Sequence, residues 1–285
     1  MIPETPVPVA PEVRYSEHRV TCSDGSAIFV RRWTPAQGPT KAELLVIHGY
    51  FEHGGRYREF AHHLATRGIA TTAPDLRGHG HSDGQRGYLE RFAAYHDDVQ
   101  AAVTLLGEAP HFFLGHSNGG LVVLDFVVMR RPQLHGVLLT NPFVAMTRPP
   151  NRGKSLIAGF FGICHPSVSL PAGVDPTTLS HDPNCTAAYA RDPLVFKVAN
   201  TGWWRETRRA QQRVRAYRAL EVPLFYCYSD SDPVASPTAN RALAEQLACP
   251  DKTVEVRHGE LHEVLHETKR DELHQAIAAW ISARI

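Results

Sequence analysis

The stretch HFFLGHSNGGLVVLDFVVMRR, residues 111–131, decides the fold predicted for this chain. It contains G-x-S-x-G at Gly115, Ser117 and Gly119, between a short apolar run and a longer run that is apolar almost all round. A serine on a sharp turn between a strand and a helix is strained, and flanking glycines make such a turn possible. The first run predicts a strand and the second a helix. The hydroxyl of Ser117 would then project above a sheet at a helix N-terminus, where free N–H groups and the helix dipole favour negative charge.

The alternation of short apolar strands and helices continues on both sides of this turn. This pattern is typical of an α/β fold with a mostly parallel central sheet and helices on both faces. Near the start, an SDGS turn between two strand-like runs predicts an antiparallel hairpin. The expected strands are residues 18–22, 27–33, 44–47, 69–73, 111–114, 136–140, 223–228 and 253–257, and the expected helices are residues 56–67, 89–106, 119–131, 237–247 and 271–285.

Residues 146–206 break this alternation. The segment is rich in proline, carries the apolar clusters LIAGFFGI and GWW, and is too long to be a simple connection between two strands. We predict a cap inserted over the carboxyl edge of the sheet, where open α/β sheets bind ligands. The chain then divides into a first core part at 1–145, with a proline-rich leader at 1–13, a cap at 146–206, and a second core part at 207–285.

The composition suits one large α/β domain, with 285 residues of which 43% are hydrophobic. A formal net charge of +1 gives no bulk attraction to nucleic acid or anionic lipid. No signal-peptide pattern and no run of about 18 apolar residues occurs, so we expect neither secretion nor a membrane span. The five cysteines form no C-x-x-C pair, which favours reduced thiols in a cytoplasmic protein. The oligomeric state stays open.

A competing motif is HEVLHE at residues 262–267, because it contains H-E-x-x-H, the zinc signature of metalloproteases. A zinc site of this kind needs a third ligand. One class places a glutamate about twenty residues beyond the second histidine, a position that lies past Ile285. Another class needs glycine and histidine at the positions held by Lys269 and Glu272. We therefore expect no metal and no cofactor, and assign the first histidine another task.

That task follows from the serine. A serine nucleophile needs a base within hydrogen-bond reach, and the base needs a carboxylate that holds its tautomer. Where the serine lies on such a strand-to-helix turn, the order along the chain is Ser, then Asp or Glu, then His. SDSDPV follows the strand expected at 223–228 and HGELHE follows that at 253–257, at the same sheet edge as Ser117. We predict Asp232 as the acid and His262 as the base.

Structural roles are expected for the other candidates nearby. Asp230 is expected to cap the turn, His258 lies too close to the strand, and His266 is expected to point away along the final helix. HEVLHE itself is expected to open that helix. In GRYREF, Arg56 and Arg58 are expected on a solvated helix face.

An oxyanion formed by attack of the serine needs two backbone N–H donors. One is Asn118, directly after the serine. The other should come from the loop after the first parallel strand, LLVIHGYFEHGGRY, where His48 and Gly49 turn the chain and Tyr50 offers its N–H. We therefore predict Tyr50 and Asn118 as the oxyanion hole.

Taken together, HGYFEHGGRY, DLRGHGHSDGQRGY, GHSNGG, SDSDPV and HEVLHE resemble the monoacylglycerol lipase / lysophospholipase branch of the α/β-hydrolases. The cap segment VDPTTLSHDPNCTAAYARDPLVF is similar to the cap of that family, and the resemblance runs from about residue 30 to the C-terminus. It implies an α/β-hydrolase fold and a serine hydrolase that cleaves a carboxylic ester of a single-chain glycerolipid. The roles carried over by position are those predicted above for Ser117, Asp232, His262, Tyr50 and Asn118.

The resemblance also implies that the cap covers a hydrophobic acyl tunnel. The candidate substrate-binding residues are Leu156, Ile157, Phe160 and Phe161. The same residues would allow peripheral contact with the membranes in which such substrates reside, and this is left open beside a cytoplasmic location. Asn118 stands where the family commonly has methionine, and HPSVSLPAG and GWW are hard to match, so the preferred acyl length and head group stay open.

Three alternatives remain beside the zinc peptidase. The chain could be a general carboxylesterase or a serine peptidase on the same fold. From another class, it could be a non-catalytic binding protein on the α/β-hydrolase fold. The expected partner is a small-molecule lipid ester substrate, and no nucleic acid is expected.

Overall fold

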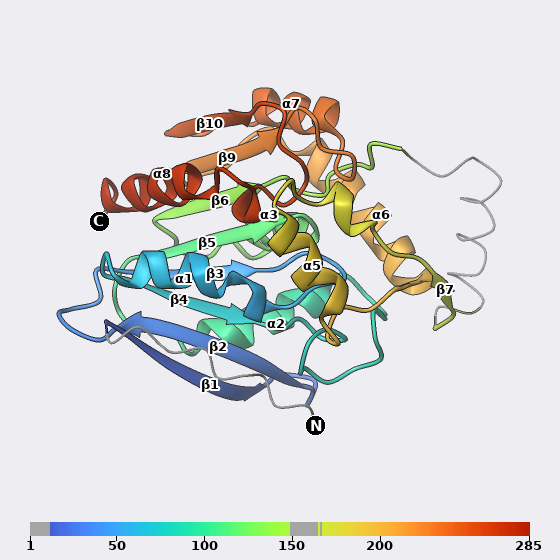
Figure 1. Cartoon of the computed structure of the whole chain (residues 1–285), viewed down its shortest axis with the longest axis horizontal. Helices are drawn as coiled ribbons and strands as arrows, with labels where there is room; N and C mark the ends of the chain where they lie inside the picture. The colour runs from blue at the N-terminus through green and yellow to red at the C-terminus, as the bar shows by residue number, and fades with distance from the viewer. Residues whose placement is uncertain (1–11, 149–164, 166) are drawn as a thin grey trace.

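A computed structural model describes residues 12–148, 165 and 167–285 of the chain. Within them, an eight-stranded sheet with the order β1-β2-β4-β3-β5-β6-β9-β10 runs through the molecule (Figure 1). Strands β1 and β2 form an antiparallel hairpin, β2 also pairs antiparallel with β4, and the remaining neighbours are parallel. The predicted hairpin and mostly parallel sheet are therefore confirmed. The strands are β1 (Val13–Thr21), β2 (Ala27–Pro35), β3 (Ala42–Ile47), β4 (Ile69–Pro74), β5 (His111–His116), β6 (Gly136–Thr140), β9 (Leu224–Ser229) and β10 (Lys252–Arg257).

Each face of the sheet has its own hydrophobic core, because successive side chains of a strand point to opposite faces. In β3, Leu45 and Ile47 belong to one core, whereas Leu44 and Val46 belong to the other. The helices that cover the first face are α2 (Ala93–Val103), α3 (Asn118–Arg130), α6 (Thr201–Ala216) and α7 (Pro237–Gln246), and those that cover the second are α1 (Arg58–Ala65) and α8 (Arg270–Ser282). Figure 1 shows α1 and α8 on the near side of the sheet.

Helix α3 explains why the run after the serine is apolar all round. Its side chains are buried from Asn118 to Val128, because the helix packs against β5 on one side and against α6 on the other. A helix enclosed in this way keeps no polar stripe for solvent.

The described part of the predicted cap consists of short elements. Strand β7 (Ser169–Pro171) pairs antiparallel with β8 (Val198–Asn200), and η2 (Pro176–Thr178) and α5 (Pro183–Arg191) lie between them in the chain. The local sequence sets the helix starts, since the Asp182 side chain accepts a hydrogen bond at the N-terminus of α5 and Asn200 does the same for α6. The predicted cap boundary at residue 206 falls inside α6, and the division into core and cap stays a prediction.

The segment HEVLHE differs from expectation, because it does not open the final helix. Val264–His266 forms the short 3-10 turn η3, and α8 begins only at Arg270. The carboxylate of Glu267 accepts hydrogen bonds from the backbone N–H groups of Leu261 and Thr268, both at 2.9 Å. These bonds hold the segment in a compact loop, and Glu267 itself has an extended backbone.

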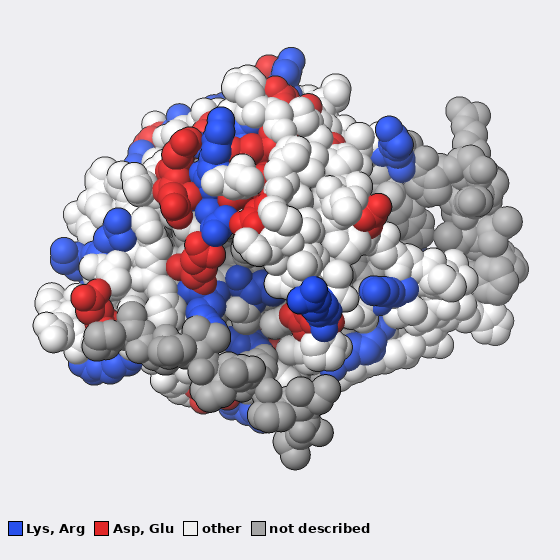
Figure 2. All heavy atoms as spheres, viewed as in Figure 1, with Lys and Arg blue, Asp and Glu red and all other residues white. Residues whose placement is uncertain are grey.

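On the face shown in Figure 2, basic and acidic side chains are interleaved. This distribution agrees with the formal net charge of only +1 for the sequence. Arg270, for example, lies 2.8 Å from both Glu59 and Asp182. None of the helices in the described part of the chain is both long enough and apolar enough to cross a bilayer.

Candidate active site

Ser117 lies on the turn between β5 and α3 and has a backbone conformation that few side chains adopt, with φ 52° and ψ −119°. The neighbouring glycines are required by close backbone packing. A Cβ on Gly119 would lie 2.0 Å from the carbonyl oxygen of Ile47, and one on Gly115 would lie 2.3 Å from the carbonyl oxygen of Gly119. The strand-turn-helix context of G-x-S-x-G is therefore present, and both glycines are fixed by sterics.

The three side chains predicted as nucleophile, base and acid lie together at the carboxyl edge of the sheet. Nε2 of His262 is 2.8 Å from Oγ of Ser117, and Nδ1 is 2.7 Å from Oδ2 of Asp232. The other carboxylate oxygen of Asp232 accepts hydrogen bonds from the N–H groups of Val234 and Ala235, at 2.7 and 3.0 Å. All three side chains are buried, so their relative positions are fixed.

The electrostatics of His262 suit a base. Burial alone would lower its pKa, but the charge of Asp232 and the hydrogen bond to it outweigh burial, and the pKa is raised above the ordinary 6.5. Since a carboxylate only accepts hydrogen bonds, Nδ1 must carry the proton in the neutral ring. Nε2 then has a free lone pair directed at the Ser117 hydroxyl.

Of the other residues in the loops after β9 and β10, Asp230 lies where the sequence predicted it and His266 does not. Asp230 accepts hydrogen bonds from the N–H of Gly259 and the ring of His258, so it stabilises the turn and lies outside the serine contact. His266 is not directed away along a helix: its side chain is only 12% exposed, and its Nε2 donates to the carbonyl oxygen of Arg56 at 3.0 Å.

The loop predicted to supply one oxyanion donor passes close to the serine. A Cβ on Gly49 would lie 3.2 Å from Cβ of Ser117, so the backbone beside Tyr50 approaches the nucleophile. The imidazole of His48 fixes this loop, because Nδ1 donates to the carbonyl oxygen of Gly49 at 2.7 Å while Nε2 accepts from the N–H of Leu76 at 2.9 Å. Burial lowers the pKa of His48 and keeps it neutral, as this bonding pattern requires.

The second predicted donor, the N–H of Asn118, is the first of α3, where helical N–H groups have no partner within the helix. Both donors therefore belong to backbone segments that adjoin Ser117. Their role in holding an oxyanion stays a prediction.

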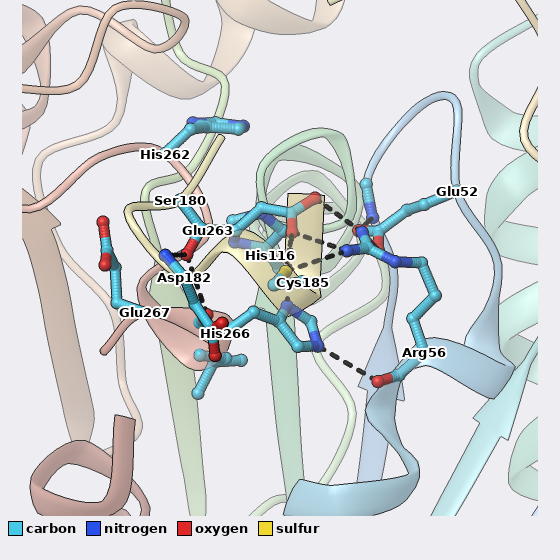
Figure 3. Close-up of polar contacts among 12 residues, drawn as sticks. Glu52, Arg56, His116, Ser180, Asp182, Cys185, His262, Glu263, His266 and Glu267 are labelled. Atoms are coloured by element: carbon cyan, nitrogen blue, oxygen red, sulfur yellow. Dashed lines mark hydrogen bonds and ion pairs between the residues drawn. The ribbon is translucent and has the colours of Figure 1, made fainter. Parts of the chain in front are cut away.

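Sequence reasoning missed a buried charge network beside His262, and Arg56 was wrongly expected on a solvated face. The side chain of Arg56 is only 9% exposed. Its guanidinium lies 2.8 Å from Glu52 and binds both oxygens of Glu263, at 2.5 and 2.6 Å (Figure 3). Oε1 of Glu52 in turn accepts the N–H of Gly49 at 2.6 Å. Arg56 therefore links the loop that carries Tyr50 to the residue that follows His262.

All members of this network are charged at neutral pH. Burial would raise the pKa of both carboxyls, but the charge of Arg56 holds the pKa of Glu52 and of Glu263 below its usual value. Burial likewise opposes the charge on Arg56, and Glu263 raises its pKa in return. Glu52, in FEH, and Arg56, in GRY, lie four positions apart in the sequence, but no sequence pattern indicated that they contact Glu263.

Two further residues that the sequence analysis passed over hold the base loop. Asn141, at the end of β6, donates from its side-chain amide to the carbonyl oxygen of His262 at 2.6 Å and accepts from the N–H of Ser229 at 2.7 Å. Its φ of 42° is one that asparagine tolerates. The ring of His116 packs 4.9 Å from that of His262, and burial, followed by the neighbouring His262, lowers the pKa of His116 to about 4. The Asn-Pro pair after β6 was the available signal for Asn141.

A cavity of about 60 Å³ opens beside Ser117. Its lining includes the aromatic side chains of Tyr50, Phe143 and Trp203 and the carboxylates Glu52 and Glu263. The described cap contributes Val174, Leu179, Tyr189 and Trp203 to the lining. The candidate acyl-binding residues Leu156, Ile157, Phe160 and Phe161 lie outside the described residues.

The two histidines of H-E-x-x-H do not point to a common centre. Both ring nitrogens of His262 bond to protein groups, Ser117 and Asp232, while His266 donates to the backbone of Arg56. Within residues 12–148, 165 and 167–285, no group of three or more His, Cys, Asp or Glu side chains is arranged to hold a metal ion.

Comparison with known proteins gives concordant results. The family described as "Serine aminopeptidase, S33" matches residues 38–269. Monoglyceride lipase of Mus musculus is 31% identical to this chain over 92% of it and 89% of the lipase. An abhydrolase domain-containing protein of Dictyostelium discoideum is 30% identical over 92% of this chain, which spans only 28% of that longer protein. The crystal structure of a monoacylglycerol lipase from Paleococcus ferrophilus has a TM-score of 0.82 at 26% identity, covering 95% of this chain and 100% of that one. This likeness confirms the fold that the sequence predicted.

Proposed function

This chain belongs to the serine aminopeptidase S33 family of the α/β-hydrolases, and on that premise we propose that it hydrolyses carboxylic esters of single-chain glycerolipids. The reaction runs through an acyl-enzyme on Ser117, with His262 as base and Asp232 as the carboxylate that orients it. The observation that carries the proposal is the continuous hydrogen-bond path from Ser117 Oγ through the His262 ring to Asp232, with distances of 2.8 and 2.7 Å.

In this mechanism His262 takes the hydroxyl proton as Ser117 attacks the ester carbonyl. The backbone N–H groups of Tyr50 and Asn118 receive the oxyanion, which costs no reorganisation because both segments are already packed. His262 then gives its proton to the departing alcohol. A water molecule hydrolyses the acyl-enzyme in the same way and restores Ser117.

The family description raises the alternative of an aminopeptidase, and the charges in the cavity favour the ester. An aminopeptidase must bind the α-ammonium group of its substrate, which calls for an available carboxylate near the nucleophile. The two carboxylates that line the cavity, Glu52 and Glu263, are both paired with Arg56. Every oxygen of these two carboxylates already accepts a hydrogen bond, so neither is free to receive an ammonium group, and the remaining lining is mostly apolar. An uncharged ester fits this site better than a cationic peptide end.

A hydrolysis panel with Ser117→Ala as the control tests the proposal. The panel contains monoacylglycerols, lysophospholipids, short p-nitrophenyl esters and aminoacyl p-nitroanilides. We expect turnover of the esters, covalent labelling of Ser117 by a fluorophosphonate, and a loss on the order of 10⁵–10⁶ in kcat for Ser117→Ala. Turnover by Ser117→Ala would overturn the mechanism. A wild-type protein that is neither labelled nor active would instead be a binding protein on this fold.

We further propose that the cap makes peripheral contact with the lipid surface that holds such substrates. The support is the exposure of Leu170 on β7, at 44%, together with the apolar composition of the cap sequence around Leu156 and Phe160. Vesicle flotation of the wild type and of a variant with Leu170, Leu156 and Phe160 replaced by serine tests this contact. Equal flotation of the two proteins would contradict it.

A further inference from the structure

Helix α6 presents a strongly basic side to solvent. Residues 197–218, KVANTGWWRETRRAQQRVRAYR, contain six arginines and one lysine but a single acidic residue, Glu206. The whole chain has 30 basic and 29 acidic residues, so this excess of positive charge is local. Glu206 is buried, whereas Arg208, Arg209 and Arg215 are exposed. The outward side of α6 therefore carries no exposed carboxylate of its own.

The inward side of the same helix explains why these arginines point outward. Buried residues recur along it at three- and four-residue spacing, and they are Trp203, Thr207, Ala210 and Val214. The indole N–H of Trp203 donates to the side-chain oxygen of Asn118 at 3.3 Å, and Trp203 lines the cavity beside Ser117. One side of α6 thus belongs to the wall of the active site, while the other side faces solvent.

The ion pairs of α6 leave part of its positive charge without a carboxylate. Glu206 binds Arg205 and Arg209, at 3.0 and 2.7 Å. Asp125 in α3 binds Arg213 at 2.8 Å. The arginines of α6 and the residues just after it that form no ion pair in the described part of the chain are Arg208, Arg215 and Arg218. Two carboxylates thus serve six arginines, and the surface keeps a net positive charge.

Helix stability does not account for this charge. The helix dipole favours cations at the C-terminus, which suits Arg213 and Arg215 in the last turn. Arg208 lies in the middle of the helix, where the dipole has little effect. Arg205 and Arg209 are four positions apart, a spacing at which like charges on a helix repel each other. A positive charge that the helix itself does not need indicates a partner outside the chain.

Apolar side chains adjoin the basic side of α6. Trp204 is half-buried, and the guanidinium of Arg208 lies 5.7 Å from the centre of its ring. Strand β8 leads directly into α6 and pairs with β7, on which Leu170 is 44% exposed (Figure 1). Basic residues together with tryptophan and leucine are typical of surfaces that lie at the boundary between lipid head groups and water. A nucleic acid would pair with the arginines but leave Leu170 in water, so a lipid surface fits better.

We propose that the outward side of α6 is a docking surface for phospholipid bilayers with anionic head groups. The inference rests on the lipid-surface contact proposed above, and it assigns that contact a lipid class and a set of charged residues. A guanidinium group binds two phosphate oxygens at once, so arginines on an exposed helix suit phosphodiester anions. Because Trp203 on the inward side lines the cavity, docking keeps the cavity within one helix diameter, about 10 Å, of the bilayer.

Cosedimentation with vesicles tests the docking surface. The full chain with Ser117→Ala is the parent protein, so that no lipid is hydrolysed during the measurement. The vesicles contain phosphatidylcholine alone or an equimolar mixture with phosphatidylglycerol, at about 0.1 M and about 1 M salt, between which the Debye length falls from about 10 to about 3 Å. The test variant adds Arg208→Gln, Arg209→Gln and Arg215→Gln. A second variant, with Arg208→Lys, Arg209→Lys and Arg215→Lys, keeps the charge.

A matched control removes the same charge outside α6. Arg14, Lys41 and Arg67 are exposed and form no ion pair in the part of the chain that the structure describes. Lys41 and Arg67 lie just before β3 and β4, at the amino edge of the sheet, whereas Ser117 lies at the carboxyl edge. The control variant is Arg14→Gln with Lys41→Gln and Arg67→Gln. It lowers the net charge by as much as the test variant does.

We expect the parent protein to bind the anionic vesicles more tightly than the phosphatidylcholine vesicles, and to lose this preference at high salt. Each basic residue near an anionic bilayer contributes roughly a fivefold gain in binding, so the glutamine variant should bind on the order of 100-fold more weakly. The lysine variant and the amino-edge control should bind like the parent.

Three outcomes would overturn the inference. They are equal binding of the parent to both kinds of vesicle, the same loss in the amino-edge control as in the glutamine variant, and tighter binding of the parent to duplex DNA than to anionic vesicles. None of them involves turnover, so each would leave the proposed ester hydrolysis standing. The hydrolysis itself fails separately, if Ser117 of the wild type resists a fluorophosphonate.

Discussion

Replacing Arg56 with methionine removes the guanidinium that pairs with two buried carboxylates, Glu52 and Glu263, beside His262. Methionine has a similar length and fills much of the same space, so lost packing adds little. The charge remaining on Glu52 and Glu263, which are 3% and 4% exposed at the side chain, has no new partner. Breaking a buried ion pair in this way costs about 3–5 kcal/mol.

The pH dependence of this loss follows from the pKa shifts. In the wild type, Arg56 lowers the pKa of Glu263. Ionised Glu263 therefore stabilises the fold at pH values above its pKa in the unfolded chain, and this stabilisation is lost as the pH falls through its pKa in the folded protein. In the variant, burial without a partner raises the pKa above the unfolded value of about 4.3. Taking up a proton on each of the two carboxyls then costs about 2 kcal/mol in total at pH 5, and much more at pH 8. The variant should therefore be less stable by about 3–5 kcal/mol at pH 8, and by about 2 kcal/mol or less at pH 5.

Urea unfolding followed by tryptophan fluorescence at the two pH values measures both losses. Arg58→Met, two positions further on, is the matched control and should stay within about 0.5 kcal/mol of the wild type. A triple variant, Glu52→Gln with Arg56→Met and Glu263→Gln, leaves this network without charge and should regain most of the stability. A loss of less than about 1 kcal/mol for Arg56→Met at pH 8, or the same loss at both pH values, would refute the reasoning.

Three other predictions concern the nucleophile turn and the base. In the wild type kcat/KM should rise with pH through a His262 pKa above 6.5, and Asp232→Asn should move this inflection to lower pH and reduce kcat on the order of 10³–10⁴; a pH–rate profile that does not move would contradict the assignment of Asp232. A methyl group at Gly119 would lie 2.0 Å from the carbonyl oxygen of Ile47, whereas at Gly173 the nearest atom would be 3.9 Å away. Gly119→Ala should thus destabilise the fold by about 3 kcal/mol and Gly173→Ala hardly at all, and equal melting temperatures would show that the turn is less crowded. Incubation with a chelator should leave ester turnover unchanged, because both ring nitrogens of His262 bond to protein groups; loss of activity that zinc restores would reject this assignment.

Much of the architecture could be predicted from sequence because its signals are local. The alternation of apolar runs reports strands that are buried on both faces, and the structure confirms the strands close to the predicted positions. The need for glycine at positions 115 and 119 could be predicted because the turn brings other backbone atoms so close to these residues that no side chain fits there. The order of loops at the carboxyl edge then placed the predicted acid in SDSDPV and the predicted base in HGELHE. The fold brings these two side chains to Ser117, while their catalytic roles stay predictions.

The rest depended on contacts between residues that are distant in the chain. Arg56 was expected in solvent because its neighbours in sequence form the start of a helix, yet its partner Glu263 is 207 positions away. A buried charge leaves no periodic pattern, and whether it is paired depends on how two loops pack. In the same way, GWW and Asn118 could not be connected before α6 was seen to lie on α3. The sequence by itself determined the strands of the main sheet and the turn that carries Ser117. Only the tertiary structure decided which carboxylates pair with Arg56 beside His262 and which indole bonds to the side chain of Asn118, because both contacts join segments that are distant in the chain and that no local signal relates.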